Sequence, residues 1–194
     1  MNILPNFYLS IAIVTLGLCS TPTYGNIETP AYVVVKQQEA FEIRQYQPMV
    51  IAEVIVNGKR KQAATSGFKL LADYIFGNNQ RQTDMAMTAP VQQHKSGESW
   101  TISFVMPAAY SLQSIPSPID DRVVIKQVQE KTFAVIQFAG WNSDRNVFKH
   151  EDRLREYLRQ NNLKPLGNPT FAFYDPPFKL PMFRRNEVML EIAN

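Results

Sequence analysis

The stretch AATSGFKLLADYIF, residues 63–76, is where the chain first shows apolar residues at helical spacing. At about 100° per residue, its apolar and small residues fall on one stripe, and Lys69 and Asp73 lie on the opposite side. Gly77 and two asparagines follow, and these residue types tolerate the left-handed conformation that ends many helices. The stretch is therefore predicted to be an amphipathic helix. Its apolar stripe consists of Ala64, Gly67, Phe68, Leu71 and Ile75.

Strands are predicted on both sides of this helix, because the flanking segments are rich in β-branched and aromatic residues and are separated by turn residues. The polar segment 94–98 contains Gly97 and separates two of these segments, so a hairpin loop that holds His94 is expected there. The predicted strands are residues 32–35, 41–46 and 49–56 before the helix, and residues 87–93 and 100–106 after it.

The same pattern restarts after residues 111–118, a segment with two prolines and three serines. Two strands, a helix and two strands follow, which makes a weak internal repeat. The second helix is predicted at residues 144–160, with His150 on its apolar side and Asn142 or Ser143 as its N-cap. The strands of this half are predicted at residues 123–127, 132–138, 170–174 and 187–192.

Each half is too small to bury its own sheet face, so the halves are expected to share one core in the α+β class. The pattern predicts a single antiparallel or mixed sheet that is curled towards a barrel and packed against both helices. A chain of 194 residues with 45% hydrophobic residues suits one such domain. Its net charge of +3 is too small to indicate a nucleic-acid surface. We therefore expect no nucleic-acid partner. The protein is also expected to be a monomer.

The N-terminal segment has the composition of a signal peptide, although no Lys or Arg precedes its apolar run at residues 7–18. The run is shorter than the roughly 20 residues that cross a bilayer. Cleavage after Gly25 is expected to leave residues 26–194 as a periplasmic or secreted domain without stable membrane insertion, and an uncleaved anchor is the alternative. Cys19 is the only cysteine and lies in this leader, so the mature domain would hold no disulfide, thiolate ligand or cysteine nucleophile.

Several short motifs, taken together, resemble the SOUL haem-binding family. They occur in the order and at the spacing of that family and cover the chain from about residue 28 to residue 192. The motifs are FEIRQY at 41–46, AMTAPV at 86–91, FVMP at 104–107 and RRNEV at 184–188, supported by Gly77 and by YDPP at 174–177.

This resemblance implies two pseudo-symmetric halves that form a distorted antiparallel β-barrel flanked by two long helices. The architecture is similar to that of bacterial small-molecule-sensing domains related to a gyrase-inhibitory protein. The resemblance also implies that haem or another porphyrin binds in an apolar groove near the first helix. The residues expected to form this site are Phe68, Leu71 and Ile75 for apolar contact, and Lys69, Arg60 and Lys61 for the propionates.

Ligands for a haem iron are few. Some animal relatives carry a histidine between the Arg and Tyr of the first motif, but this chain has Gln45 there, which excludes a histidine-ligated haem at that position. His150 is the remaining candidate for a metal ligand, because His94 is expected in an exposed turn. Arg184 and Arg185 are interpreted as structural, with salt bridges and loop carbonyls as their partners. A carboxylate-binding role for one of them is the alternative.

Catalytic motifs are lacking, since the sequence has no G-x-S-x-G, H-E-x-x-H, C-x-x-C or phosphate-cradling glycine loop. The chain is therefore not expected to be an enzyme. Two alternatives stay open. One is a small hydrolase of hydrophobic esters that uses Glu187 with Tyr174, by analogy with hydrolases of related fold. The other is a non-catalytic interaction module of the cell envelope.

Overall fold

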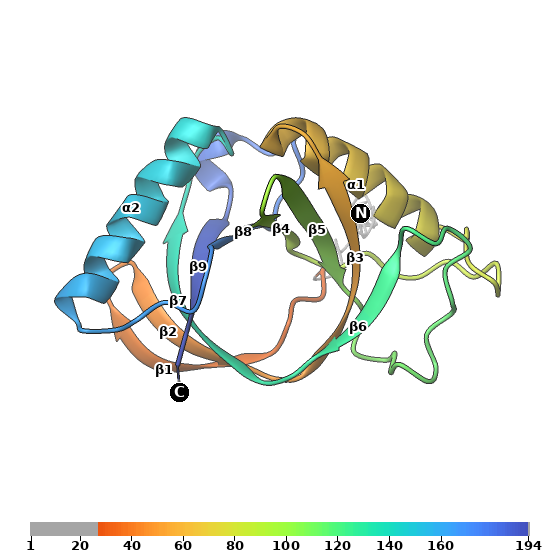
Figure 1. Cartoon of the computed structure of the whole chain (residues 1–194), viewed down its shortest axis with the longest axis horizontal. Helices are drawn as coiled ribbons and strands as arrows, with labels where there is room; N and C mark the ends of the chain where they lie inside the picture. The colour runs from red at the N-terminus through yellow and green to blue at the C-terminus, as the bar shows by residue number, and fades with distance from the viewer. Residues whose placement is uncertain (1–26, 194) are drawn as a thin grey trace, which may run out of the picture.

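The computed structural model describes residues 27–193. The predicted signal peptide, residues 1–25, lies outside this region. The described chain forms one strongly curled antiparallel sheet, and two long helices flank it (Figure 1). No helix within residues 27–193 is long and apolar enough to cross a membrane.

Strands and helices follow one another in the predicted order. The helices are α1 (Arg60–Ile75) and α2 (Asp144–Gln160), and a short 3-10 turn, η1 (Pro181–Phe183), precedes the last strand. The strands are β1 (Tyr32–Gln38), β2 (Phe41–Tyr46), β3 (Met49–Asn57), β4 (Val91–Ser96), β5 (Ser99–Val105), β6 (Val124–Val128), β7 (Lys131–Phe138), β8 (Thr170–Phe173) and β9 (Asn186–Ile192).

The strand order confirms the internal repeat. The order across the sheet is β1-β2-β7-β9-β8-β4-β5-β3-β6, and neighbouring strands are antiparallel. If β2-β3-α1-β4-β5 is matched with β6-β7-α2-β8-β9, the order reads the same from either end, with β1 as an added edge strand. The two halves meet at the central pair of β4 and β8, so the pseudo-two-fold relation passes between these strands.

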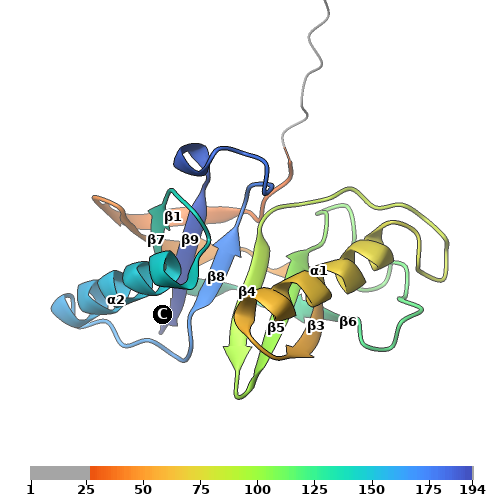
Figure 2. The ribbon, with the colours of Figure 1, turned by 90° about the horizontal axis from the view of Figure 1, so that it is seen from above.

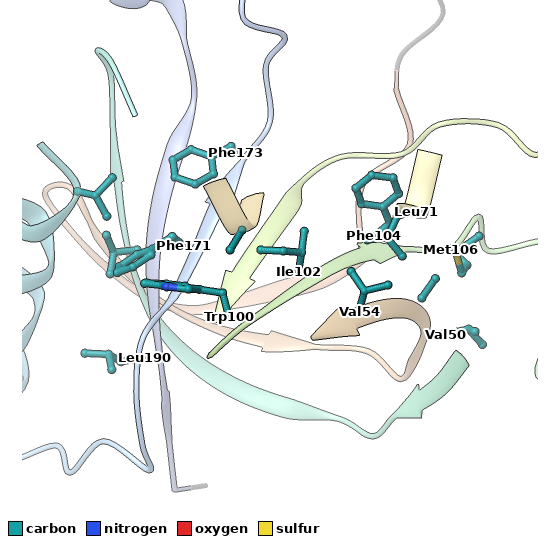
Figure 3. Packing of buried hydrophobic residues seen from close by; sticks show 14 of the residues in the cluster. Val50, Val54, Leu71, Trp100, Ile102, Phe104, Met106, Phe171, Phe173 and Leu190 are labelled. Carbon is teal, nitrogen blue, oxygen red and sulfur yellow. The ribbon is translucent and has the colours of Figure 1, made fainter. Parts of the chain in front are cut away.

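Both helices cover the same face of the sheet, α1 over β3 and β5 and α2 over β7 and β9. The closest approach of α1 is at Gly67, where a Cβ atom would lie 2.5 Å from Cγ1 of Ile102 on β5. Glycine is therefore required for the helix to rest on the strand. Around this contact lies the main core, in which Val54, Ile102 and Leu71 are among the buried residues (Figure 3).

A second, smaller cluster lies on the other face of the sheet, inside its curl. Successive side chains of a strand point to opposite faces, and on β9 Val188 and Leu190 join the main core, whereas Met189 joins the second cluster. Tyr46, Val135 and Ala172 complete the buried part of this cluster. The curl thus buries both faces of the central strands.

Most predicted boundaries agree with the structure to within a few residues. The second helix has the predicted bounds, and Ser143 is its N-cap, with a side-chain oxygen that accepts a hydrogen bond from the Asn146 amide at 3.3 Å. The expected loop at residues 94–98 is wrong. β4 and β5 continue to Ser96 and Ser99, because the turn needs only two residues and begins at Gly97 with a φ of 58°. His94 is consequently a strand residue.

Candidate functional site

The surface beside α1 is built around Phe68, which belongs to the apolar stripe predicted for this helix. The ring is 42% exposed and meets Phe104 of β5 edge-on, with 5.4 Å between the ring centroids. Phe104 pairs with Val91 of β4, which in turn pairs with Phe173 of β8. Phe68 therefore lies against β5, the strand next to the central pair β4 and β8, which runs between the helices (Figure 2).

A matching aromatic contact lies on the side of α2. Phe148 is 43% exposed and packs edge-on against Phe171 of β8 at 6.0 Å, and Trp100 of β5 lies 6.2 Å from the same Phe171 ring. Phe171 and Trp100 are both buried, and Figure 3 shows them beside each other. Aromatic side chains thus extend from α1 to α2 across β4 and β8, with one partly exposed phenylalanine at each end.

Leu71 and Ile75 lie on the side of α1 that faces the sheet. Their side chains are 0% and 2% exposed and belong to the main core. A ligand on the surface of α1 would meet Phe68 and not these two residues, because they face the sheet. Their contribution in this structure is to hold the helix, and with it Phe68, in place.

The three basic residues predicted for the site divide into two kinds. Lys61 and Lys69 are exposed, and Lys61 lines a shallow depression on α1. Arg60 is buried and fully engaged: it donates to Asp144 at 2.7 Å, to Gln93 at 2.9 Å and to the backbone carbonyl of residue 142 at 2.6 Å. Arg60 therefore ties the beginning of α1 to the beginning of α2, and the two lysines remain as exposed cations.

His150 is packed into the core of the second half. Its ring stacks on Phe138 of β7 at 3.9 Å between centroids, and Nδ1 donates to the Asn146 carbonyl at 2.7 Å. Burial lowers the pKa of His150, although the hydrogen bond to Asn146 opposes this effect. Four strand spacings of about 4.8 Å separate β7 from β5, or roughly 19 Å along the sheet. The structure therefore does not bring His150 together with Phe68.

The described residues contain no cluster of three or more His, Cys, Asp or Glu side chains that would hold a metal ion. His94, on β4, lies beside Thr170 of the neighbouring β8, with 3.4 Å between Nδ1 and Oγ1.

Glu187 is the centre of a buried polar network inside the curl of the sheet. Its Oε1 accepts from Nε and Nη2 of Arg185 at 2.9 and 2.7 Å, and its Oε2 accepts from Nη1 of Arg44 at 2.9 Å and from the Tyr174 hydroxyl at 3.0 Å. Glu187 is 0% exposed. Burial and the neighbouring Glu187 charge raise the pKa of Tyr174, and burial raises that of Tyr46 to about 12. The structure thus places Glu187 next to Tyr174, but both carboxylate oxygens are occupied and shielded from solvent.

Sequence reasoning missed Arg44 and Tyr46 as members of this network. The signal was their alternation along FEIRQY, which puts Arg44 and Tyr46 on one face of β2. The interpretation of Arg184 and Arg185 as structural residues is confirmed. Arg184 donates to the backbone carbonyls of Pro177 and Lys179, and Arg185 pairs with Glu187.

A separate cleft lies where the N-terminal residues 28–31 cross the β2–β3 turn and the loop after β5. Its volume is about 260 Å³, and Met49, Met106 and Tyr110 line it. Small-molecule sites usually have volumes of about 300–1,000 Å³. None of the predicted site residues contributes to this cleft.

Sequence comparison gives one family and several relatives. A family model described as SOUL heme-binding protein matches residues 27–191. Heme-binding protein 1 of Xenopus tropicalis is 28% identical over 184 residues, which cover 89% of this chain and 96% of the relative. Heme-binding protein 2 of Homo sapiens is 29% identical over 178 residues, with 84% and 85% covered.

Structural comparison gives solved structures of the same fold. A crystal structure of a hydrolase from Listeria innocua has a TM-score of 0.56 at 11% identity and covers 82% of this chain and 94% of its own. The EcmrR C-terminal domain has a TM-score of 0.57 at 9% identity, with 79% and 97% covered. At these identities the likeness concerns the fold alone.

Proposed function

The chain belongs to the SOUL heme-binding protein family, and on that basis we propose that it binds haem or another porphyrin on the surface beside α1, without catalysing a reaction. The observation that carries this proposal is Phe68, an aromatic ring that is 42% exposed and yet fixed against Phe104. A planar macrocycle gains most from an aromatic surface that is already ordered before binding.

The charges around Phe68 suit the carboxylates of a porphyrin. Lys61 lies seven residues before Phe68, close to two helical turns, and Lys69 is its neighbour. Both ammonium groups are exposed, so either can turn towards a propionate at small cost. Arg60 keeps its partners Asp144 and Gln93 in this arrangement and supports the site from within.

We propose that the affinity comes more from contact with the porphyrin ring than from a protein ligand to the iron. His150 is buried against Phe138 and lies roughly 19 Å along the sheet from the strand under Phe68. Apolar contact and the two lysines would then provide the affinity, and iron-free porphyrins would compete with haem.

The hydrogen bonding of the Glu187 carboxylate favours a non-catalytic role. A general base needs a free lone pair within reach of a substrate. Both oxygens of Glu187 accept hydrogen bonds from Arg44, Arg185 and Tyr174 inside the sheet. The carboxylate and tyrosine pair is therefore better suited to stability than to ester hydrolysis.

The apolar run at residues 7–18 supports the further proposal that the protein is exported and works in the periplasm or outside the cell. N-terminal sequencing of the protein from its own host would test this. A first residue near position 26 is expected, and recovery of the uncleaved chain in the cytoplasm would contradict export.

Hemin titration tests the central proposal. The wild-type protein should give a saturable change of the Soret band near one equivalent, and Phe68→Asp should weaken binding about ten-fold, because a charge replaces the stacking surface. Leu166→Asp is the matched control, since Leu166 is 55% exposed on a loop that follows α2. Unsaturable spectra, or equal affinity in the Phe68→Asp and Leu166→Asp variants, would refute the proposed site.

A further inference from the structure

Two neighbouring loops expose an unusual group of large apolar side chains. The loop between β8 and β9 and the loop before α2 carry five of them, each between 59% and 84% exposed. Monomeric proteins rarely leave such groups in water unless the surface meets a ligand, a partner or a membrane. We call this group the apolar tip. It consists of Trp141, Phe178, Leu180, Met182 and Phe183.

The two loops are held in place by hydrogen bonds. The Gly140 amide donates to the Pro181 carbonyl at 2.8 Å, and the Asn186 side chain donates to the Gly140 carbonyl at 3.0 Å. Arg184 donates to the Lys179 carbonyl at 2.7 Å, and its guanidinium lies 4.8 Å from the centre of the Trp141 ring. The apolar side chains are therefore presented by an ordered backbone.

The apolar tip is a projection. Figure 2 shows the loop with η1 standing out beyond the sheet and both helices, at the upper edge of that view. A peptide partner needs a groove or a sheet edge that receives its side chains, and a projecting loop supplies neither. A projecting loop with large apolar side chains instead suits a soft, fluid surface that can close around it.

The described chain begins on this same side of the molecule. In Figure 2 its orange N-terminal end and the loop with η1 both lie at the upper edge.

Two basic residues lie close in sequence to the residues of the apolar tip. Arg145 is exposed in the first turn of α2, four residues after Trp141, and it forms no ion pair within residues 27–193. Lys179 lies between Phe178 and Leu180 and is 40% exposed beside its partner Asp175. Basic residues next to exposed aromatic rings are typical of segments that lie in the headgroup region of anionic bilayers.

We propose that the apolar tip docks reversibly on a phospholipid bilayer, with Trp141 at the level of the headgroups and Phe178 and Phe183 below it. This interaction goes beyond porphyrin binding, because none of its residues belongs to the surface around Phe68. It is peripheral, and the sheet and both helices stay in water.

Vesicle binding of the full chain tests the proposal through Trp141. The vesicles are phosphatidylcholine with or without phosphatidylglycerol, and their acyl chains are brominated to quench nearby tryptophan. Trp141 fluorescence should be quenched, and more strongly with phosphatidylglycerol. Trp100 is 7% exposed, so a Trp141→Phe variant supplies its background signal. Because the reporter is in the loop, the result does not depend on whether residues 7–18 also bind the vesicles.

The double variant Phe178→Asp/Phe183→Asp should reduce this quenching and weaken vesicle binding about ten-fold, whereas Leu166→Asp should not. Hemin affinity and thermal unfolding of the same variants confirm that the fold is intact. Vesicle binding without Trp141 quenching would overturn the proposal. So would equal quenching in the double variant, or loop-dependent self-association without vesicle binding.

Discussion

Nη1 of Arg44 and Oε2 of Glu187 lie 2.9 Å apart, and the two side chains are 1% and 0% exposed. The pair joins β2 to β9 across 143 positions of sequence. Arg185 and Tyr174 complete the hydrogen bonding of the carboxylate. A buried charge of this kind is tolerated only when its partners are all present.

Removal of the Glu187 charge should therefore destabilise the fold strongly. Glu187→Gln leaves Arg44 and Arg185 facing a neutral amide inside the sheet, and breaking a buried pair costs about 3–5 kcal/mol. Urea unfolding measures this loss. Glu156→Gln is the control, because Glu156 and Arg159 form an exposed pair and no measurable change is expected. A small loss for Glu187→Gln would show that the network is not required.

Gly67→Ala should destabilise the protein although alanine favours helices. The added Cβ would lie 2.5 Å from Cγ1 of Ile102, so α1 or β5 must shift. Overpacking of this kind costs about 1–3 kcal/mol, which exceeds the roughly 1 kcal/mol gained in helix propensity. Ser66→Ala, at an exposed position of the same helix, should leave stability equal or slightly higher. Thermal unfolding of both variants decides between these outcomes.

The lysines near Phe68 should matter only for ligands that carry carboxylates. Lys61→Gln/Lys69→Gln should weaken hemin binding about three- to ten-fold, since each exposed pair contributes up to about 1 kcal/mol. Binding of the hemin dimethyl ester should stay the same, because it has no free carboxylate. An equal loss for both ligands would mean that the lysines act through packing of the helix.

Iron should contribute little to binding. His150 is stacked on Phe138 in the second half of the core, away from Phe68. Protoporphyrin without iron should therefore bind within about three-fold of hemin, and His150→Gln should leave the Soret maximum unchanged. A shifted Soret band in this variant would identify His150 as an iron ligand.

His150 should also make stability depend on pH. Burial lowers its pKa below the usual 6.5, so just below that pH the folded protein binds fewer protons than the unfolded chain. The stability from the neutral ring is present above pH 6.5 and is lost as the pH falls towards the folded-state value. The Tm should drop between about pH 7.5 and about pH 5.5, and His150→Gln should drop less. Equal slopes would contradict this assignment.

The fold could be predicted where the sequence has clear residues that cap or end a helix. The second helix has the predicted bounds because Ser143 caps its beginning and Pro165 lies shortly beyond its end. The hairpin around Gly97 was assigned too long a loop, because polar residues such as His94 occupy a strand. Composition alone does not distinguish a polar strand from a loop, since its partners β5 and β8 lie elsewhere in the sequence.

The candidate site could be predicted only in part. The apolar stripe of α1 identified Phe68, Leu71 and Ile75 together, yet a stripe does not tell which of its residues the sheet covers. Burial separates them, because Phe68 lies on the flank of the helix and the other two face the sheet. Arg60 was assigned to the ligand site as one of the basic residues nearest the apolar stripe. Its partner Asp144 is 84 residues away, beyond the reach of any local pattern.

The palindromic strand order makes this chain a covalently linked pair of half-size units that meet at β4 and β8. Each position in one half therefore has an equivalent position in the other half, and a binding site needs only one of the two. Here both helices expose a phenylalanine, Phe68 on α1 and Phe148 on α2, but only α2 buries a histidine, His150. Because each half has its own sequence, the two helices carry different side chains, and their surfaces need not serve the same purpose.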